Sequence, residues 1–314
     1  MQRRLIVHIG TGKTGSTAIQ RGLTQSADQL RSLGVYYWGL NLERATTSTR
    51  HDWQAADGIG ILQKQSVESA KEQLGQILNE ALGSLDSDAV AIWSNESIYE
   101  RPAVYVPIID AATRAADVEL QVICFARSHR TYIQSAYKQW GIKHKTYRGP
   151  IQSFSEWVTN KREFLSYGSK LSAWDEAFGN RFTLFNYEHG SNVMATLADL
   201  LPNNAGDVLR TLKKRPNRSP SPTSLAFYAL HNNQSLAPIA PQAAERLLHQ
   251  ARPTELCHQL LDLDALYPDD TKLDAAEAEL AADIELVNQL LSKQGQPSLS
   301  QGHHGQDEAR ITAE

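Results

Sequence analysis

A lysine, several glycines and several hydroxyl residues stand together where an apolar stretch meets a helical pattern, and residues of these types bind phosphate. They lie in the segment HIGTGKTGSTAIQ, residues 8–20. The first N–H groups of a helix lack intrahelical partners, and the helix dipole adds about half a positive charge at that end. Lys13 adds a full charge, while Thr14, Ser16 and Thr17 add hydroxyl donors. The pattern therefore predicts an anion site at the start of a helix, rather than a turn with incidental polar residues.

The spacing of this segment differs from that of the ATP-binding loop, G-x-x-x-x-G-K-[ST]. Gly12-Lys13-Thr14 supplies the end of that pattern, but Val7 stands where its first glycine is required. The strands expected to end at Trp93 and Phe125 run into Ser-Asn-Glu and Ala-Arg-Ser, which offer no aspartate to hold Mg²⁺. A standard ATPase or GTPase is therefore disfavoured, and a kinase with a shortened phosphate loop stays as an alternative.

Residues 13–17, Lys-Thr-Gly-Ser-Thr, resemble the 5′-phosphosulfate loop of the sulfotransferases that use 3′-phosphoadenosine 5′-phosphosulfate (PAPS). The longer segment most resembles the bacterial, carbohydrate-type branch of that family. The family's second element is a strand ending in arginine, followed by a helix that carries serine eight positions later. The segment VICFARSHRTYIQSAYKQW supplies Arg127 and Ser135 at that spacing. An arginine and a serine placed in this way can converge on one phosphate beyond the carboxyl end of a strand.

The resemblance covers roughly residues 5–220 and implies a cofactor and a binding set. PAPS would be the sulfuryl donor and 3′,5′-ADP the product, with no metal required. Arg127 and Ser135 would hold the 3′-phosphate. The 5′-phosphosulfate would be held by the residues of the loop, Gly12, Lys13, Thr14, Gly15, Ser16 and Thr17.

The implied reaction is in-line transfer of the sulfuryl group to a hydroxyl or amine of a saccharide, glycolipid or small metabolite. Lys13 would stabilise the charge that builds on the leaving oxygen, and a base must take the acceptor's proton. Glu96 is the first candidate, because its S-x-E stretch resembles the region where carbohydrate sulfotransferases keep an acidic base; a helix-capping role is the alternative. His51, in a polar loop, is the second candidate base or an ordinary surface residue. His8 is expected to be a hydrogen-bonded core histidine.

Two further segments resemble or suit parts of such a site. RPNRSPSP resembles a loop that precedes the C-terminal helices in the bacterial branch. The resemblance implies that Asn217 and Ser219 would contact nucleotide or acceptor, and a proline-rich connector is the alternative. KQWGIKHKTYRGP interleaves basic and aromatic residues that suit an acidic glycan or a solvated helix end, whereas Trp157 and Trp174 are expected in the core. The loops around residues 38–65 and 140–165 would select the acceptor.

Strands that alternate with helices indicate an α/β fold with three layers and a mostly parallel sheet. Together with the loop, the resemblance implies a P-loop-like phosphosulfate-binding core at 1–220. We expect a helical extension at 221–293 and a disordered tail at 294–314. Strands are expected at Leu5–Ile9, Val35–Trp38, Ala89–Trp93, Leu120–Phe125 and Arg181–Phe185. Helices are expected at 14–30, Ser66–Leu82, Thr131–Trp140, Ala243–Leu248 and Leu273–Leu291.

Composition limits the other function classes. The net charge of −4 over 314 residues gives no whole-chain support for binding nucleic acid or a membrane surface. No apolar run approaches the roughly 20 residues of a membrane span, and MQRRLIVHIG is too short for a signal-peptide core. Cys124 and Cys257 fit neither a disulfide framework nor a metal site. We therefore expect a cytoplasmic enzyme, with a non-catalytic 3′,5′-ADP-binding protein as a further alternative.

Overall fold

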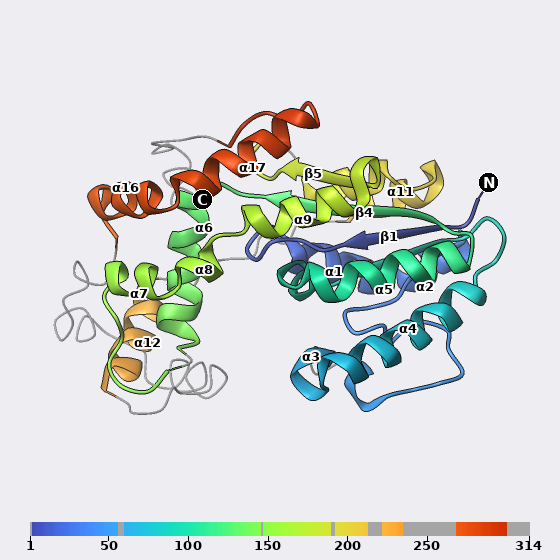
Figure 1. Ribbon diagram of the computed structural model, residues 1–314, viewed down its shortest axis with the longest axis horizontal. Helices are drawn as coiled ribbons and strands as arrows, with labels where there is room; N and C mark the ends of the chain where they lie inside the picture. The colour runs from blue at the N-terminus through green and yellow to red at the C-terminus, as the bar shows by residue number, and fades with distance from the viewer. Residues whose placement is uncertain are drawn as a thin grey trace. The chain divides into compact units, whose positions relative to one another are not determined.

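The computed structural model describes residues 2–55, 60–145, 147–189, 192–212, 222–234 and 268–299. Its centre is a five-stranded, all-parallel sheet with the order β2-β3-β1-β4-β5 (Figure 1). All five strands predicted from the sequence are confirmed, and no strand end differs from its prediction by more than one residue. The strands are Arg4–His8 (β1), Val35–Tyr37 (β2), Val90–Ser94 (β3), Glu119–Ala126 (β4) and Phe182–Asn186 (β5).

The central strand β1 is apolar on both faces because helices cover both sides of the sheet. Leu5, Ile6 and Val7 are all fully buried, as is usual for a parallel strand. The register places His8 opposite Ser94 of β3 and opposite Ile123 of β4. The segments that follow β1, β3 and β4 therefore leave the sheet at one shared edge.

One face of the sheet packs on helices that come from two distant parts of the chain. They are Ser16–Gln25 (α1), Ala27–Ser32 (α2), Val193–Asp199 (α10) and Asn203–Arg210 (α11). The single helix predicted over 14–30 is thus two helices, because the backbone of Ser26, at φ −104° and ψ 7°, leaves the helical region between them. Ile19, Leu23 and Leu30 still point into one core, as their spacing predicted.

The other face packs on longer helices: Val67–Gly83 (α4), Pro102–Ala115 (α5) and Gly168–Phe178 (α9). Trp93 of β3 meets Tyr105 of α5 edge to face, with ring centroids 6.4 Å apart. The fold is therefore α/β with three layers. Short helical turns connect these elements: Asp52–Gln54 (η1), Ile61–Lys64 (α3), Glu96–Glu100 (η2) and Gly179–Arg181 (η4).

Contacts group the described residues into two compact units. The first contains the sheet and lies within Met1–Arg127, Tyr167–Asn217 and Glu285–Pro297; the second lies within Ser128–Ser166, Arg218–Ile284 and Ser298–Glu314. This grouping differs from a division at residue 220, because residues 128–166 contact helices from late in the chain. Within the described residues, the second unit contains the helices His129–Ala136 (α6), Tyr137–Lys143 (η3, a π-helix), Phe154–Asn160 (α7), Arg162–Leu165 (α8), Pro222–Gln234 (α12) and Asp270–Glu279 (α16).

The last helix and the segment after it differ from the sequence expectation. The helix predicted over Leu273–Leu291 is divided into α16 and Ala281–Lys293 (α17). Residues 294–299 were assigned to a disordered tail, yet Gln294 Oε1 accepts a hydrogen bond from Leu184 N at 2.7 Å, and Pro297 O accepts one from Asn186 at 2.9 Å.

Several predicted features lie outside the described residues, namely Asn217, Ser219, Ala243–Leu248, Cys257 and the chain after residue 299. Over the described ranges, each helix is too short or too polar to cross a bilayer.

Candidate functional site

The loop between β1 and α1 adopts two left-handed backbone positions just before the helix. Gly15 is the N-cap of α1 with φ 85° and ψ 7°, and Lys13 has φ 68°. A Cβ on Gly15 would lie 3.0 Å from Val193 Cγ2, so this position combines a glycine conformation with tight packing. Left-handed backbone at a non-glycine residue is uncommon and collects at ligand sites. The loop thus turns sharply into the free N–H groups of α1.

The hydroxyl groups of the loop have different surroundings. Thr14 donates to Thr11 O at 2.5 Å, and Thr11 donates to Phe125 O of β4 at 2.9 Å. These two bonds hold the loop in shape, so the Thr14 hydroxyl that the sequence offered to a ligand is engaged within the loop. Thr17 is exposed. Ser16 is buried, and its Oγ has no hydrogen-bond partner in the described structure.

Gly10 provides space beside this buried hydroxyl. A Cβ built on Gly10 would lie 2.8 Å from Ser16 Oγ and 2.7 Å from His8 Nε2, closer than real Cβ atoms approach. Only glycine at this position leaves both polar atoms unobstructed. Because an unpartnered buried polar group costs about 1–3 kcal/mol, Ser16 is suited to a ligand that supplies the missing partner.

Arg127 lies beside the loop, at the end of the neighbouring strand β4. Its Nη1 donates to Lys13 O at 3.3 Å, and its guanidinium lies over the Tyr187 ring at 5.6 Å from the centroid. The Tyr167 hydroxyl donates to the carbonyl of Arg127. The structure therefore brings Lys13 and Arg127 to one edge of the sheet, as the strand order requires.

Ser135 lies in α6 of the second unit, where it is half-buried. The N-cap of α6 is Ser128, whose Oγ accepts a hydrogen bond from Thr131 N. Directly after α6 the chain forms the π-helix η3, a rare element that is often found at functional sites. The convergence of Ser135 with Arg127 on one phosphate stays a prediction.

Glu96 follows β3 at the same edge as the loop and is partly exposed. Its Oε2 accepts a hydrogen bond from Gln20 Nε2 at 2.6 Å, and Gln20 belongs to α1. The adjacent Asn95 is the N-cap of η2: its Oδ1 accepts from Ser97 N at 2.9 Å. Asn95 therefore performs the capping that was the alternative role for Glu96, and the Glu96 carboxylate is directed to the helix that starts at the loop.

Residues 38–55 form a loop attached to the carboxyl end of β3. Leu40 O accepts hydrogen bonds from Trp93 Nε1 and Asn95 Nδ2, both at 2.9 Å. His51 lies in this loop with its ring stacked on Trp53, at 6.0 Å between centroids and an angle of 13°. His51 Nε2 is buried without a partner in the described structure. No contact joins His51 to α1 among the described hydrogen bonds, whereas Glu96 has one.

His8 is a core histidine with one satisfied nitrogen, as predicted. Its Nδ1 lies 2.8 Å from Ser94 Oγ, and complete burial lowers the pKa of its ring to about 4. His8 is therefore neutral near pH 7.

Gln20 and Ser94 were not predicted from the sequence to be site residues. Gln20 stands four positions after Ser16, a spacing that places both on one face of a helix, so that signal was available. The position of Ser94 depends on the pairing of β1 with β3, which one sequence does not reveal.

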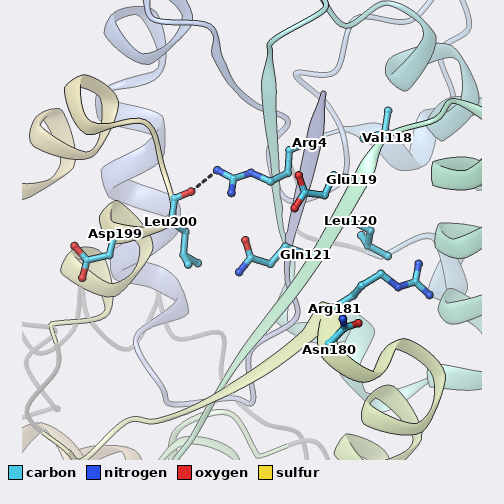
Figure 2. A pocket seen from close by; sticks show the side chains of 9 residues that line it. All are labelled: Arg4, Val118, Glu119, Leu120, Gln121, Asn180, Arg181, Asp199 and Leu200. Atoms are coloured by element: carbon cyan, nitrogen blue, oxygen red, sulfur yellow. Dashed lines mark hydrogen bonds between the residues drawn. The ribbon is translucent and has the colours of Figure 1, made fainter. Parts of the chain in front are cut away.

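The opposite edge of the sheet has a cavity of about 500 Å³ (Figure 2). Its polar groups are largely engaged, since Arg4 donates to Leu200 O and Arg181 pairs with Asp110 at 3.1 Å. Ligands of open α/β sheets bind at the carboxyl ends of the strands, so this cavity at the amino ends is not the candidate site. Its lining is Arg4, Val118, Glu119, Leu120, Gln121, Asn180, Arg181, Asp199 and Leu200.

The chain matches no protein-family model and no curated protein sequence. Its function must therefore be inferred from the residues at the carboxyl edge of β1, β3 and β4.

Proposed function

We propose that the chain is a sulfotransferase that moves the sulfuryl group of PAPS to a hydroxyl or amine of a saccharide, glycolipid or small metabolite. The observation that carries the proposal is the segment from Ile9 to Thr17, between β1 and the start of α1, which we call the anion loop. Its Ser16 hydroxyl is buried beside Gly10 without a partner in the described part of the chain, and Arg127 donates to its Lys13 O. Its short turn suits one phosphosulfate group better than a triphosphate, whose loop has four residues between its glycines.

The residues present fit an anionic nucleotide at this edge. Ser16 Oγ, the Lys13 ammonium and the first N–H groups of α1 would hold the 5′-phosphosulfate. Arg127, next to Lys13, would hold the 3′-phosphate with its planar, permanently charged donors. PAPS, when bound, supplies the sulfuryl group and an adenosine bisphosphate leaving group.

The chain's own groups would act as donor and base. Lys13 and α1 present positive charge where the leaving oxygen gains negative charge, and removing a preorganised donor of this kind typically lowers the rate by roughly 10²–10³. Glu96 is our choice of base, because Gln20 orients its Oε2 from α1 and leaves the carboxylate partly exposed. The attached loop of residues 38–55 would border the acceptor.

The test is thermal stabilisation by 3′,5′-ADP compared with ATP and Mg²⁺. A ligand that binds only the folded protein at a hundredfold excess over its Kd adds about 2.7 kcal/mol to the free energy of unfolding. We expect stabilisation by 3′,5′-ADP that Arg127→Ala abolishes. Arg21→Ala, which removes a cation from an exposed position of α1, is the matched control and should keep it.

The same thermal measurements, together with an assay of sulfuryl transfer, separate the alternative functions. Stabilisation by ATP and Mg²⁺ alone would overturn the proposal in favour of a kinase with a shortened loop. Stabilisation by 3′,5′-ADP without any sulfuryl transfer across a panel of acceptors would favour a non-catalytic binder. In a sulfotransferase, Lys13→Ala must remove turnover.

A further inference from the structure

The strongest unexplained feature of the first unit is a pair of buried polar atoms that face the same point and have no hydrogen-bond partner among the described residues. They are His8 Nε2 and Ser16 Oγ. His8 is fully buried and Ser16 is 5% exposed. The Cβ position of Gly10 is 2.7 Å from one atom and 2.8 Å from the other. Native proteins leave few buried polar atoms unpaired, so two that share one gap call for an explanation.

The other nitrogen of His8 is already fixed. Nδ1 lies 2.8 Å from Ser94 Oγ, which sets the plane of the ring and holds Nε2 toward the gap. A neutral imidazole carries its proton on one nitrogen only. If the Ser94 hydroxyl donates to Nδ1, then Nε2 carries the proton and is a donor.

The choice of tautomer decides what Ser16 can do. A serine hydroxyl has one proton to give and two lone pairs that accept. If Ser16 gave its proton to Nε2, none would remain for an anion at the start of α1. If Nε2–H donates to Ser16 Oγ instead, the Ser16 proton stays available to the anion.

We propose that His8 is a positioning residue of the anion loop, with its proton on Nε2, and that it donates to Ser16 Oγ when an anion is bound so that the Ser16 proton points to the ligand. The proposal rests on the proposed function, since it takes the 5′-phosphosulfate as that anion. The proposal requires the Ser16 side chain to rotate past Gly10, so that Ser16 Oγ comes within hydrogen-bond distance of His8 Nε2.

The same contacts extend toward the base. Ser94 O accepts a hydrogen bond from Gln20 Nε2 at 3.4 Å, and that amide also donates to Glu96 at 2.6 Å. His8 therefore lies between the anion loop and the end of the strand that carries the base, without contacting substrate itself.

Two isosteric variants separate the two nitrogens of His8. The asparagine amide in His8→Asn reaches the position of Nδ1 but not that of Nε2, whereas the longer glutamine of His8→Gln reaches toward Nε2. Binding of 3′,5′-ADP is measured by calorimetry, with adenosine 3′-monophosphate as the probe that lacks the 5′ group. We expect His8→Asn to weaken 3′,5′-ADP by roughly 10–100-fold, as for a hydrogen bond to a charged group, with little change for the 3′-monophosphate. His8→Gln should restore most of the affinity.

Equal losses for both nucleotides, or no loss in His8→Asn, would overturn the role of His8. The wild-type protein gives an independent readout, because ¹⁵N spectra of the histidine ring report which nitrogen carries the proton. A proton on Nδ1 with bare Nε2 would also overturn the proposal, even if the variants fail to fold. If the wild-type protein does not bind 3′,5′-ADP, the proposed function fails, and the comparison of His8→Asn with wild type is decided with inorganic phosphate.

Discussion

Replacing Gly10 with alanine tests the anion loop through a single methyl group. The new Cβ would lie 2.7 Å from His8 Nε2 and 2.8 Å from Ser16 Oγ, so one of the two side chains must move. Overpacking of a buried site typically costs about 1–3 kcal/mol. We therefore expect Gly10→Ala to lower the free energy of unfolding by that amount, measured as a shift of the urea midpoint at an unchanged slope.

Gly10→Ala should also weaken the binding of 3′,5′-ADP, and this loss of affinity tests the anion loop more directly than the loss of stability does. At a concentration that gives wild type about 2.7 kcal/mol of stabilisation, a tenfold weaker Kd would leave about 1.4 kcal/mol. Thermal shifts with 3′,5′-ADP, over a range of concentrations, measure this difference directly. We expect a displacement of Ser16 to weaken binding at least tenfold.

Gly83→Ala is the matched control. Gly83 is the last residue of α4, and a Cβ there would meet nothing within 4 Å. The control should be neutral or more stable by about 0.4–1 kcal/mol, since alanine restricts the unfolded chain. If Gly10→Ala and Gly83→Ala have the same free energy of unfolding and the same affinity for 3′,5′-ADP, the space beside Gly10 has no role in anion binding.

Three further predictions concern the base, the cofactor and pH. Glu96→Gln should lower kcat by roughly 10²–10⁴ and leave the affinity for 3′,5′-ADP unchanged, whereas a larger loss in His51→Ala would transfer the role of base to His51. Arg127→Ala should weaken 3′,5′-ADP more than adenosine 5′-monophosphate, and equal losses in calorimetry would place Arg127 away from the 3′-phosphate. Burial lowers the pKa of His8 to about 4, so between pH 6.5 and 4 the unfolded state binds the extra proton and stability falls with falling pH. Relative to neutral pH, the free energy of unfolding at pH 5 is lower by about 2 kcal/mol. Urea titrations at several pH values should show this loss in wild type. A His8→Gln variant whose stability falls as steeply with pH as that of wild type would contradict the prediction.

The strands were predictable because each is a buried apolar run between polar segments. Boundaries inside the helices were not. The apolar spacing of residues 14–30 continues across Ser26, although the backbone there interrupts the helix. Likewise the stripe of Thr131–Trp140 is divided between α6 and the π-helix η3, since periodicity of apolar residues does not distinguish neighbouring helical geometries.

Residue types predicted which residues lie at the site, but not the contacts that depend on how the strands pair. Lys13 and Arg127 were predicted at one edge because each follows the carboxyl end of a strand in a parallel sheet, and the structure brings them together. The contacts of His8 with Ser94 follow from the register of β1 and β3, and that of Gln20 with Glu96 from the packing of α1 on β3. Neither register nor packing is encoded in a local pattern.

The same limit explains how the loop's hydroxyls divide their work. The sequence presents Thr14, Ser16 and Thr17 as equivalent donors near Lys13, but only Ser16 is both buried and without a partner in the described structure. Thr14 is used to hold the loop, and that bond helps to keep Lys13 in a left-handed conformation that costs about 1–3 kcal/mol when unsupported. A strained lysine held in place by its neighbours, next to a buried hydroxyl without a partner among the described residues, is what the proposed anion site requires. In a loop with only a structural role, we would expect the lysine backbone to be relaxed and the hydroxyl to be hydrogen-bonded.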